Sequence, residues 1–135
     1  MKDLIERLEK AIGPDRELDK DIWLAVTPGA TWKRTRVTGH RSGREWDVDE
    51  PRINGGRLVD IPMYSASFDA ALTLVPEGHD WIVASVNGQV GGTPYASVGD
   101  EKMHFGETPV LSLCIAALRA RDFAKRDLTK MEAGK

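Results

Sequence analysis

The segment Tyr64-Ser-Ala-Ser-Phe-Asp-Ala-Ala-Leu-Thr-Leu-Val-Pro-Glu-Gly78 predicts a short capped helix. Ser65 or Ser67 can cap this helix, because a serine hydroxyl accepts hydrogen bonds from the free N–H groups of a first helical turn. Pro76 is expected to end it. The apolar side chains behind the cap repeat at helical spacing and predict a buried stripe. They are Phe68, Ala71, Leu72 and Val75.

A second capped helix is predicted in Thr108-Pro-Val-Leu-Ser-Leu-Cys-Ile-Ala-Ala-Leu-Arg-Ala-Arg121. Thr108 suits the N-cap, and Pro109 suits the first helical position because the N–H that proline lacks has no helical partner there. We expect the tail 122–135 to extend this helix and then fray. The apolar residues follow the i, i+3, i+4, i+7 spacing of a face turned to the core. They are Leu111, Cys114, Ile115 and Leu118.

Between these helices the sequence predicts an antiparallel meander of short strands. Trp81–Val86, Tyr95–Val98 and Lys102–Phe105 carry the β-branched and aromatic residues typical of strands. Asn87–Gly92 and Gly99–Asp100 supply the turns between them. We therefore expect a small sheet against which both helices pack.

Two further helices are predicted at the start of the chain. The first is stopped by Gly13-Pro14, and Asp15 is the expected N-cap of the second, which ends near Thr27. The apolar positions at helical spacing are Leu4, Ile5, Leu8, Ala11 and Ile12 in the first helix, and Leu18, Ile22, Ala25 and Val26 in the second.

The two helical blocks around the meander resemble the phage ABA-sandwich domain family of small phage and prophage proteins. The resemblance covers residues 1–28 and 60–121, and it is carried mainly by Ser67–Gly78 and Thr108–Leu118. It implies helices flanking a small sheet, and it brings no catalytic motif. His79 stands where relatives place an aromatic residue.

Together these patterns predict an α/β (α+β) fold, a small antiparallel sheet flanked by helices in an αβα sandwich-like arrangement. We expect a single domain over 1–135. Its expected parts are the N-terminal helices (1–28), a variable β-rich insert (31–59), a helix-meander-helix core (60–121) and the C-terminal tail (122–135).

The composition excludes several classes of protein. Of 135 residues, 41% are hydrophobic and 30% charged, and the net charge is −2. No apolar run approaches the roughly 18 residues of a membrane-spanning helix, and Met1–Lys10 is too charged for a signal peptide. A single cysteine, Cys114, cannot form an internal disulfide, which favours a reducing compartment. We expect a protein of the bacterial cytoplasm with no membrane partner.

No catalytic, metal-binding or cofactor-binding residue is predicted. The histidines, His40, His79 and His104, lack the spacing of metal ligands. Cys114 lies on an apolar stripe and is interpreted as a packed core thiol. Asp69 and Glu77 could form a carboxylate pair, but a structural role is favoured because Asp69 falls in a first helical turn. Gly88, Gly91 and Gly92 fit a hairpin turn better than a phosphate-binding loop.

The insert is predicted to hold two or three short strands, or to be a mobile ribbon, with a tight turn of positive φ at Asn54-Gly55. The candidate strands are Thr35–Thr38, Glu45–Asp49 and Arg57–Ile61. Its charges are segregated, since the basic half is followed directly by Glu45, Asp47, Asp49 and Glu50. Pairing of the two halves across a hairpin is one interpretation. The other is a partner-binding surface made of Trp32, Lys33, Arg34, Arg36, Arg41, Arg44 and Trp46.

The leading hypothesis for function is a phage or prophage accessory protein that binds a host or phage protein. Inhibition of a host defence system such as CRISPR would suit such a chain. The alternative is a nucleic-acid-binding accessory protein that uses the basic segment 33–44. A small enzyme is the third possibility.

Overall fold

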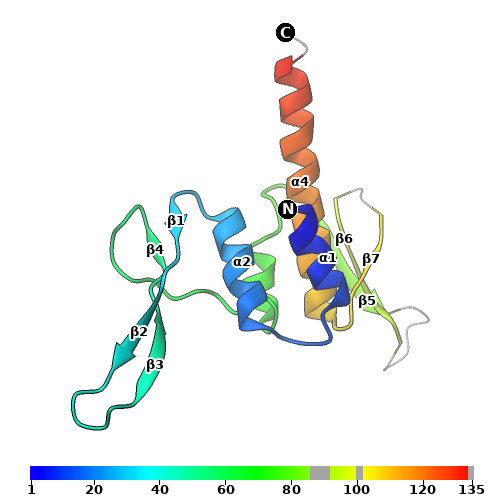
Figure 1. The fold of residues 1–135 in the computed structure, drawn as a ribbon. Coiled ribbons are helices and arrows are strands. Elements are labelled where there is room, and N and C mark those ends of the chain that lie inside the picture. The colour runs from blue at the N-terminus through cyan, green and yellow to red at the C-terminus, as the bar shows by residue number, and fades with distance from the viewer. Residues whose placement is uncertain (86–91, 100–101, 134–135) are drawn as a thin grey trace.

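The computed structural model describes residues 1–85, 92–99 and 102–133, with side chains up to Ala124. Its helices and antiparallel strands confirm the α+β class expected from the sequence (Figure 1). In chain order they are α1 (Lys2–Lys10), α2 (Arg16–Val26), β1 (Ala30–Thr31), β2 (Arg34–Thr38), β3 (Glu45–Asp49), β4 (Arg52–Ile53), α3 (Phe68–Leu72), β5 (Trp81–Ser85), β6 (Pro94–Val98), β7 (His104–Phe105) and α4 (Pro109–Ala133).

The predicted meander is present as a three-stranded sheet. β5, β6 and β7 lie side by side in that order, and both pairings are antiparallel. β7 begins at His104, two residues later than expected, whereas Val86 and most of the predicted turn at Asn87–Gly92 lie outside the described residues. Ala96 and Val98 of β6 are completely buried, and α4 packs along this strand.

Helix α4 is the centre of the core. Its four predicted core residues are all buried, and Thr108 caps its start by accepting the Leu111 N–H at 3.1 Å. Leu113, Ala116 and Ala117 are also buried, so this part of α4 is covered on every side. The cover comes from the sheet on one side and from α1 and α3 on others. Beyond this core α4 continues to Ala133 and extends away from the other elements (Figure 1).

The short helix α3 begins as predicted but ends early. The Ser67 hydroxyl accepts the Ala70 N–H at 3.3 Å and caps the helix. The expectation that the helix runs to Pro76 is wrong, because it ends at Leu72. From Thr73 to Val75 each N–H bonds a carbonyl three residues back, which gives tight single turns instead of a continuing helix.

The remaining predicted core residues are less deeply placed than the α4 stripe. Leu72, Val75 and Val83 are partly buried against the core. Trp81 remains 42% exposed, although its ring makes an edge-to-face contact with Phe68 at a centroid distance of 5.5 Å. The strand β5 is therefore only half covered.

The two N-terminal helices form, with a shifted boundary and a shifted face. Helix α1 ends at Lys10 because Ala11 adopts an extended conformation, so the prediction that Ile12 belongs to its apolar face is wrong and Ile12 is 88% exposed. Asp15 caps α2 as expected, by accepting the Glu17 N–H at 2.8 Å. The buried face of α2 is Leu18, Asp19, Ile22 and Trp23, whereas Ala25, predicted to point inward, is exposed.

The shift of that face is explained by the buried side chain of Asp19, which is 1% exposed. Its Oδ1 accepts hydrogen bonds from both the backbone N–H and the hydroxyl of Ser65, each at 2.7 Å. Its Oδ2 accepts from Arg16 at 3.0 Å. A buried carboxylate is tolerated when hydrogen bonds replace its hydration, so α2 can turn this polar side chain inward.

Cys114 lies beside this contact and behaves as the predicted core thiol. It is completely buried and donates to the carbonyl oxygen of Tyr64 at 3.2 Å. Burial raises the pKa of the thiol to about 12, so the thiolate does not form at neutral pH. The segment Tyr64-Ser65 is therefore attached to α4 on one side and to α2 on the other.

Replacing Leu118, which is completely buried, with alanine should lower the free energy of unfolding by about 2–5 kcal/mol, because the change leaves a cavity in a packed core. Phe123→Ala is the matched control, since Phe123 lies on the same helix but is 62% exposed. The control should change stability by less than about 0.5 kcal/mol. Urea unfolding of both variants measures the difference, and equal losses would contradict this description of the core.

Candidate functional site

The insert is one continuous β-hairpin. In every residue pair of β1–β4 and of β2–β3 the two residue numbers add to the same total. The two ladders therefore share one register, and neither side of the hairpin has an extra residue between them. The ladder begins where Asn54 N–H donates to the Gly29 carbonyl at 2.8 Å, and it closes where Gly39 N–H donates to the Arg44 carbonyl at 2.8 Å. We call residues 29–54 the arm.

Pro51 explains why the ladder looks interrupted in the middle. The neighbouring pair Lys33–Glu50 is hydrogen-bonded, with Glu50 N–H donating to the Lys33 carbonyl at 2.8 Å. Hydrogen-bonded and non-hydrogen-bonded pairs alternate in an antiparallel ladder. Pro51, which stands opposite Trp32, therefore occupies a position whose nitrogen faces away from the partner strand. The proline removes no bond between the strands, as is usual for proline at a strand edge.

At the other end of the arm the predicted turn is confirmed, but the strand after it is not. Asn54 and Gly55 have φ of 53° and 70°, and Gly56 N–H donates to the Ile53 carbonyl at 3.0 Å. The prediction of a strand at Arg57–Ile61 is wrong. Within the described chain this segment forms only a single bridge, from Leu58 to Arg52, because the two-residue strand β4 offers no longer edge for pairing.

The base of the arm is attached to α2 through Trp32. The Lys20 Nζ lies 4.0 Å from the centroid of the Trp32 ring, and the Arg34 guanidinium carbon lies 4.9 Å from it. The indole N–H is buried and has no hydrogen-bond partner in the described part of the chain. Contacts between cations and the ring, together with burial, therefore hold this side chain in place.

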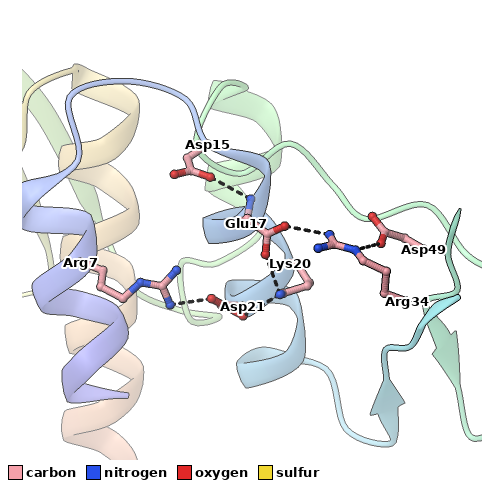
Figure 2. A network of polar contacts seen from close by, with 7 residues as sticks. All are labelled: Arg7, Asp15, Glu17, Lys20, Asp21, Arg34 and Asp49. Atoms are coloured by element: carbon pink, nitrogen blue, oxygen red, sulfur yellow. Dashed lines mark hydrogen bonds and ion pairs between the residues drawn. The ribbon is translucent and has the colours of Figure 1, made fainter. Parts of the chain in front are cut away.

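Glu17 of α2 forms hydrogen-bonded ion pairs with both of these cations, Lys20 and Arg34 (Figure 2). It accepts a hydrogen bond from Lys20 at 2.7 Å and another from Arg34 at 2.9 Å, and Arg34 also donates to Asp49 at 2.9 Å. The hydrogen bond from Lys20, followed by that from Arg34, lowers the pKa of Glu17 to about 2. We call Glu17, Lys20, Trp32 and Arg34 the latch, because they join the arm to the body.

Above the latch, the hydrogen bonds and ion pairs that the structure describes for the arm are made within the arm itself. In the pairing of β2 with β3 the basic and acidic halves lie opposite one another, and Arg36 donates to Glu45 at 2.9 Å. On the other face the Thr35 hydroxyl donates to Glu50 at 2.8 Å and lowers the pKa of that carboxyl. The interpretation that these charges pair across a hairpin is confirmed for Arg34 and Arg36. Figure 1 shows β2 and β3 projecting away from the helices.

One face of the projecting part is apolar. Side chains alternate between the two faces of a ribbon, and the cross-strand pairs Val37–Trp46 and Thr35–Val48 place Val37, Trp46 and Val48 together. Trp46 is 48% exposed. Its ring lies against the backbone at Gly39, where a Cβ would approach the ring to 3.3 Å. We call Val37, Trp46 and Val48 the apolar face of the arm.

The tip of the arm carries charge that is not neutralised. Arg41 and Arg44 are exposed and make no ion pair within the described residues, and His40 is exposed beside them. Lys33, near the base, is exposed and likewise forms no ion pair among the described side chains. The tip is therefore positively charged next to the apolar face.

The seven predicted partner-binding residues thus divide into separate groups. Trp32 and Arg34 belong to the latch, and Arg36 is engaged with Glu45. Trp46, Arg41 and Arg44 are available at the outer end, and Lys33 is available near the base. Val37 and Val48 were not predicted from the sequence, although their alternation with charged residues indicates one apolar side of a ribbon. The latch residues of α2, Glu17 and Lys20, were not predicted either.

The structure offers no comparable chemical site elsewhere in its described part. Among these residues no cluster of histidine, cysteine or acidic side chains could hold a metal ion, and no helix is long and apolar enough to cross a membrane. A cavity of about 480 Å³ lies between α2, α4 and Pro76. The Arg121 guanidinium in its wall donates to the carbonyl oxygens of Leu74 and Thr73, at 2.6 and 3.3 Å. This cation is therefore engaged in hydrogen bonds to the backbone of the protein itself.

Comparisons with known proteins do not identify relatives: no family model, no curated protein and no solved structure matches the sequence. The resemblance to the phage ABA-sandwich domain family therefore stays a prediction from the sequence blocks that carry it. The arm is the candidate site on the strength of its geometry alone.

The latch should give Glu17 a recognisable pH signature. Its pKa is about 2 in the folded protein and about 4.3 in an unfolded chain, so its charge stabilises the fold above the higher value. That contribution is lost as the pH falls toward the lower value. The stability difference between wild type and Glu17→Gln should therefore shrink between neutral pH and about pH 3. Because the side chain is 50% exposed, the difference should not exceed about 1 kcal/mol at neutral pH.

Urea unfolding at both pH values measures this difference. Glu6→Gln serves as the control, because Glu6 is exposed and forms no ion pair among the described residues. The control should show almost no stability difference at either pH. A Glu17→Gln difference that is the same at both pH values would contradict the latch.

Proposed function

We propose that this protein acts by binding another protein, and that the outer end of the arm makes the contact. The observation that carries the proposal is the apolar face, Val37, Trp46 and Val48, on a ribbon whose described hydrogen bonds and ion pairs above the latch are all internal. A two-stranded ribbon has no second layer to cover such a face. Apolar residues placed there contribute little to folding, whereas they can be buried in a complex.

The residue types at the outer end suit a protein contact. Tryptophan and arginine account for much of the energy at protein interfaces, mainly where they fill desolvated pockets. Trp46 is half exposed, and Arg41 and Arg44, which precede it in the chain, are exposed and form no ion pair among the described residues. The partner surface should therefore combine an apolar groove, which accepts the Trp46 ring, with acidic groups on its rim that attract the two arginines.

The latch makes such binding efficient. Ordering a mobile segment at the moment of binding reduces affinity, so a segment that is already fixed binds more tightly. Trp32 and Arg34 fix the base of the arm to α2 before any partner arrives. Their role in binding is to position the arm, and the contact itself falls to Trp46 and the tip.

We further propose, on the sequence resemblance, that the protein is a phage or prophage accessory protein acting in the bacterial cytoplasm. Inhibition of a host defence system such as CRISPR is a role that a small binding protein of this kind would serve. The arm supports the binding part of this proposal, and the biological setting is supported by the resemblance.

Capture of partners from bacterial lysate, followed by mass spectrometry, tests the proposal when wild type and variants are compared. Trp46→Ala should weaken binding of a captured partner by about 1–3 kcal/mol with an unchanged thermal melt. Ile53→Ala is the matched control, because Ile53 lies in the same arm near its base and is 38% exposed. It should bind like wild type. Normal binding by Trp46→Ala would contradict the proposal, as would a loss explained by unfolding.

Nucleic acid is the second candidate partner, since Arg41 and Arg44 are free cations on a projecting hairpin. Acidic residues of the same arm oppose it: Asp47 makes no ion pair in the described structure and follows Arg44 by three residues on the same side of the hairpin. We expect no duplex binding at physiological salt. Measurable binding whose log K falls by about 0.9 per log salt for each phosphate neutralised, with a smaller slope in Arg41→Ala/Arg44→Ala, would favour nucleic acid instead.

A further inference from the structure

The outer edge of strand β5 is open in the described structure. β5 lies at the end of the three-stranded sheet and pairs only with β6. Its five residues, Trp81-Ile-Val-Ala-Ser85, contain no charge and no proline. Natural sheets usually protect an open edge with charged residues, proline or a bulge. Here Trp81 is 42% exposed and Ile82 is 59% exposed, so an unprotected apolar edge faces outward.

The ladder with β6 shows which backbone groups point outward at this edge. Gly99 N–H donates to the Asp80 carbonyl at 2.7 Å, so this pair is a hydrogen-bonded one. Because hydrogen-bonded pairs alternate along the ladder, Ile82 and Ala84 also direct their N–H and C=O groups toward β6. Trp81, Val83 and Ser85 therefore direct theirs away from β6, toward the open edge. Pro94, opposite Ser85, agrees with this alternation because its position requires no N–H toward β5.

We propose that β5 pairs with β5 of a second copy of this chain, antiparallel, about a two-fold axis that passes beside Val83. In this register Trp81 of each copy stands opposite Ser85 of the other, and every outward N–H of the three edge residues meets a carbonyl. On the neighbouring positions Ile82 stands opposite Ala84 of the second copy. A large side chain thus stands opposite a small one in the Trp81–Ser85 pair and in the Ile82–Ala84 pair. The two β5 strands bring no charges opposite one another.

The second copy is favoured over a different partner because the strand is complementary to itself in this way. A two-fold contact uses the same surface on both subunits and closes on itself. The far edge of the sheet, β7, has only two residues, His104 and Phe105, which is too short to continue the pairing. The assembly therefore stops at two chains instead of growing into a fibre. This inference depends on β5 alone, and it holds or fails independently of the arm.

Sedimentation velocity over a range of protein concentrations tests the pairing. Wild type should form dimers, and Ile82→Glu should raise the dimer dissociation constant at least about tenfold, because it places like charges near one another across the axis. Met103→Glu is the matched control: Met103 is 55% exposed and lies at the β7 side of the sheet. It should dimerise like wild type. Circular dichroism establishes that both variants are folded.

Cross-linking tests the register. In the proposed pairing Ile82 and Ala84 of the second copy form a non-hydrogen-bonded pair, whose Cα atoms lie about 4.5 Å apart, within the range for a disulfide. The double variant Ile82→Cys/Ala84→Cys should form covalent dimers under mild oxidation, whereas Met103→Cys should not. Cys114 is completely buried and does not interfere. A wild-type protein that stays monomeric at all concentrations, a dimer unaffected by Ile82→Glu, or failure of the double variant to cross-link would overturn the proposal.

Discussion

The hydrogen bonds between the buried carboxylate of Asp19 and Ser65 fix the position of α2, and the rest of the molecule depends on that position. A buried charge is costly unless it is fully hydrogen-bonded. Asp19 meets this requirement only where Ser65 supplies two donors and Arg16 supplies a third. Arg16 belongs to α2 and moves with it, but any rotation or sliding of α2 would leave the carboxylate without the two donors of Ser65. An apolar contact would tolerate such movement, so the polar one specifies a single placement.

Helix α2 then serves two parts of the protein at once. One side packs Leu18 and Ile22 into the core, and the opposite side presents Glu17 and Lys20 to the arm. Asp21, between these sides, accepts a hydrogen bond from Arg7 of α1 (Figure 2). Because α2 is fixed against the core, its contacts with Arg34 and Trp32 also fix the base of the arm. In the proposed function the helices and the sheet are a support, and the arm is the element that would meet a partner.

Local patterns were sufficient to predict the elements that local chemistry determines. The caps at Ser67 and Thr108, the apolar stripe of α4 and the bounds of β3 follow from spacing and from the chemistry of single residues. The burial of Asp19 could not be predicted this way, because its partner Ser65 is far away in the sequence and the helical stripe alone favoured Ala25. Ile12 was misplaced because the apolar spacing of the sequence continues two residues beyond Lys10, where the helix ends.

The candidate site was predictable only in part for the same reason. Segregated charge and the tryptophans indicated the segment that forms the arm, and pairing of opposite charges across a hairpin is a local property. The latch joins Glu17 to Arg34 across separate elements, so the sequence could not show that Trp32 and Arg34 serve as an attachment while Trp46 stays free. Distinguishing attachment from contact required the three-dimensional arrangement.

In the proposed function, α2 holds the arm in one orientation before a partner binds. The most direct test is the distribution of distances between spin labels at Thr38→Cys, near the arm tip, and Phe123→Cys on α4, measured by pulsed electron resonance. Both sites are exposed, whereas the native Cys114 is completely buried. The account predicts one narrow distance that broadens when Trp32→Ala and Glu17→Gln remove the latch. A distribution that is already broad with the latch intact, and unchanged without it, would contradict the account.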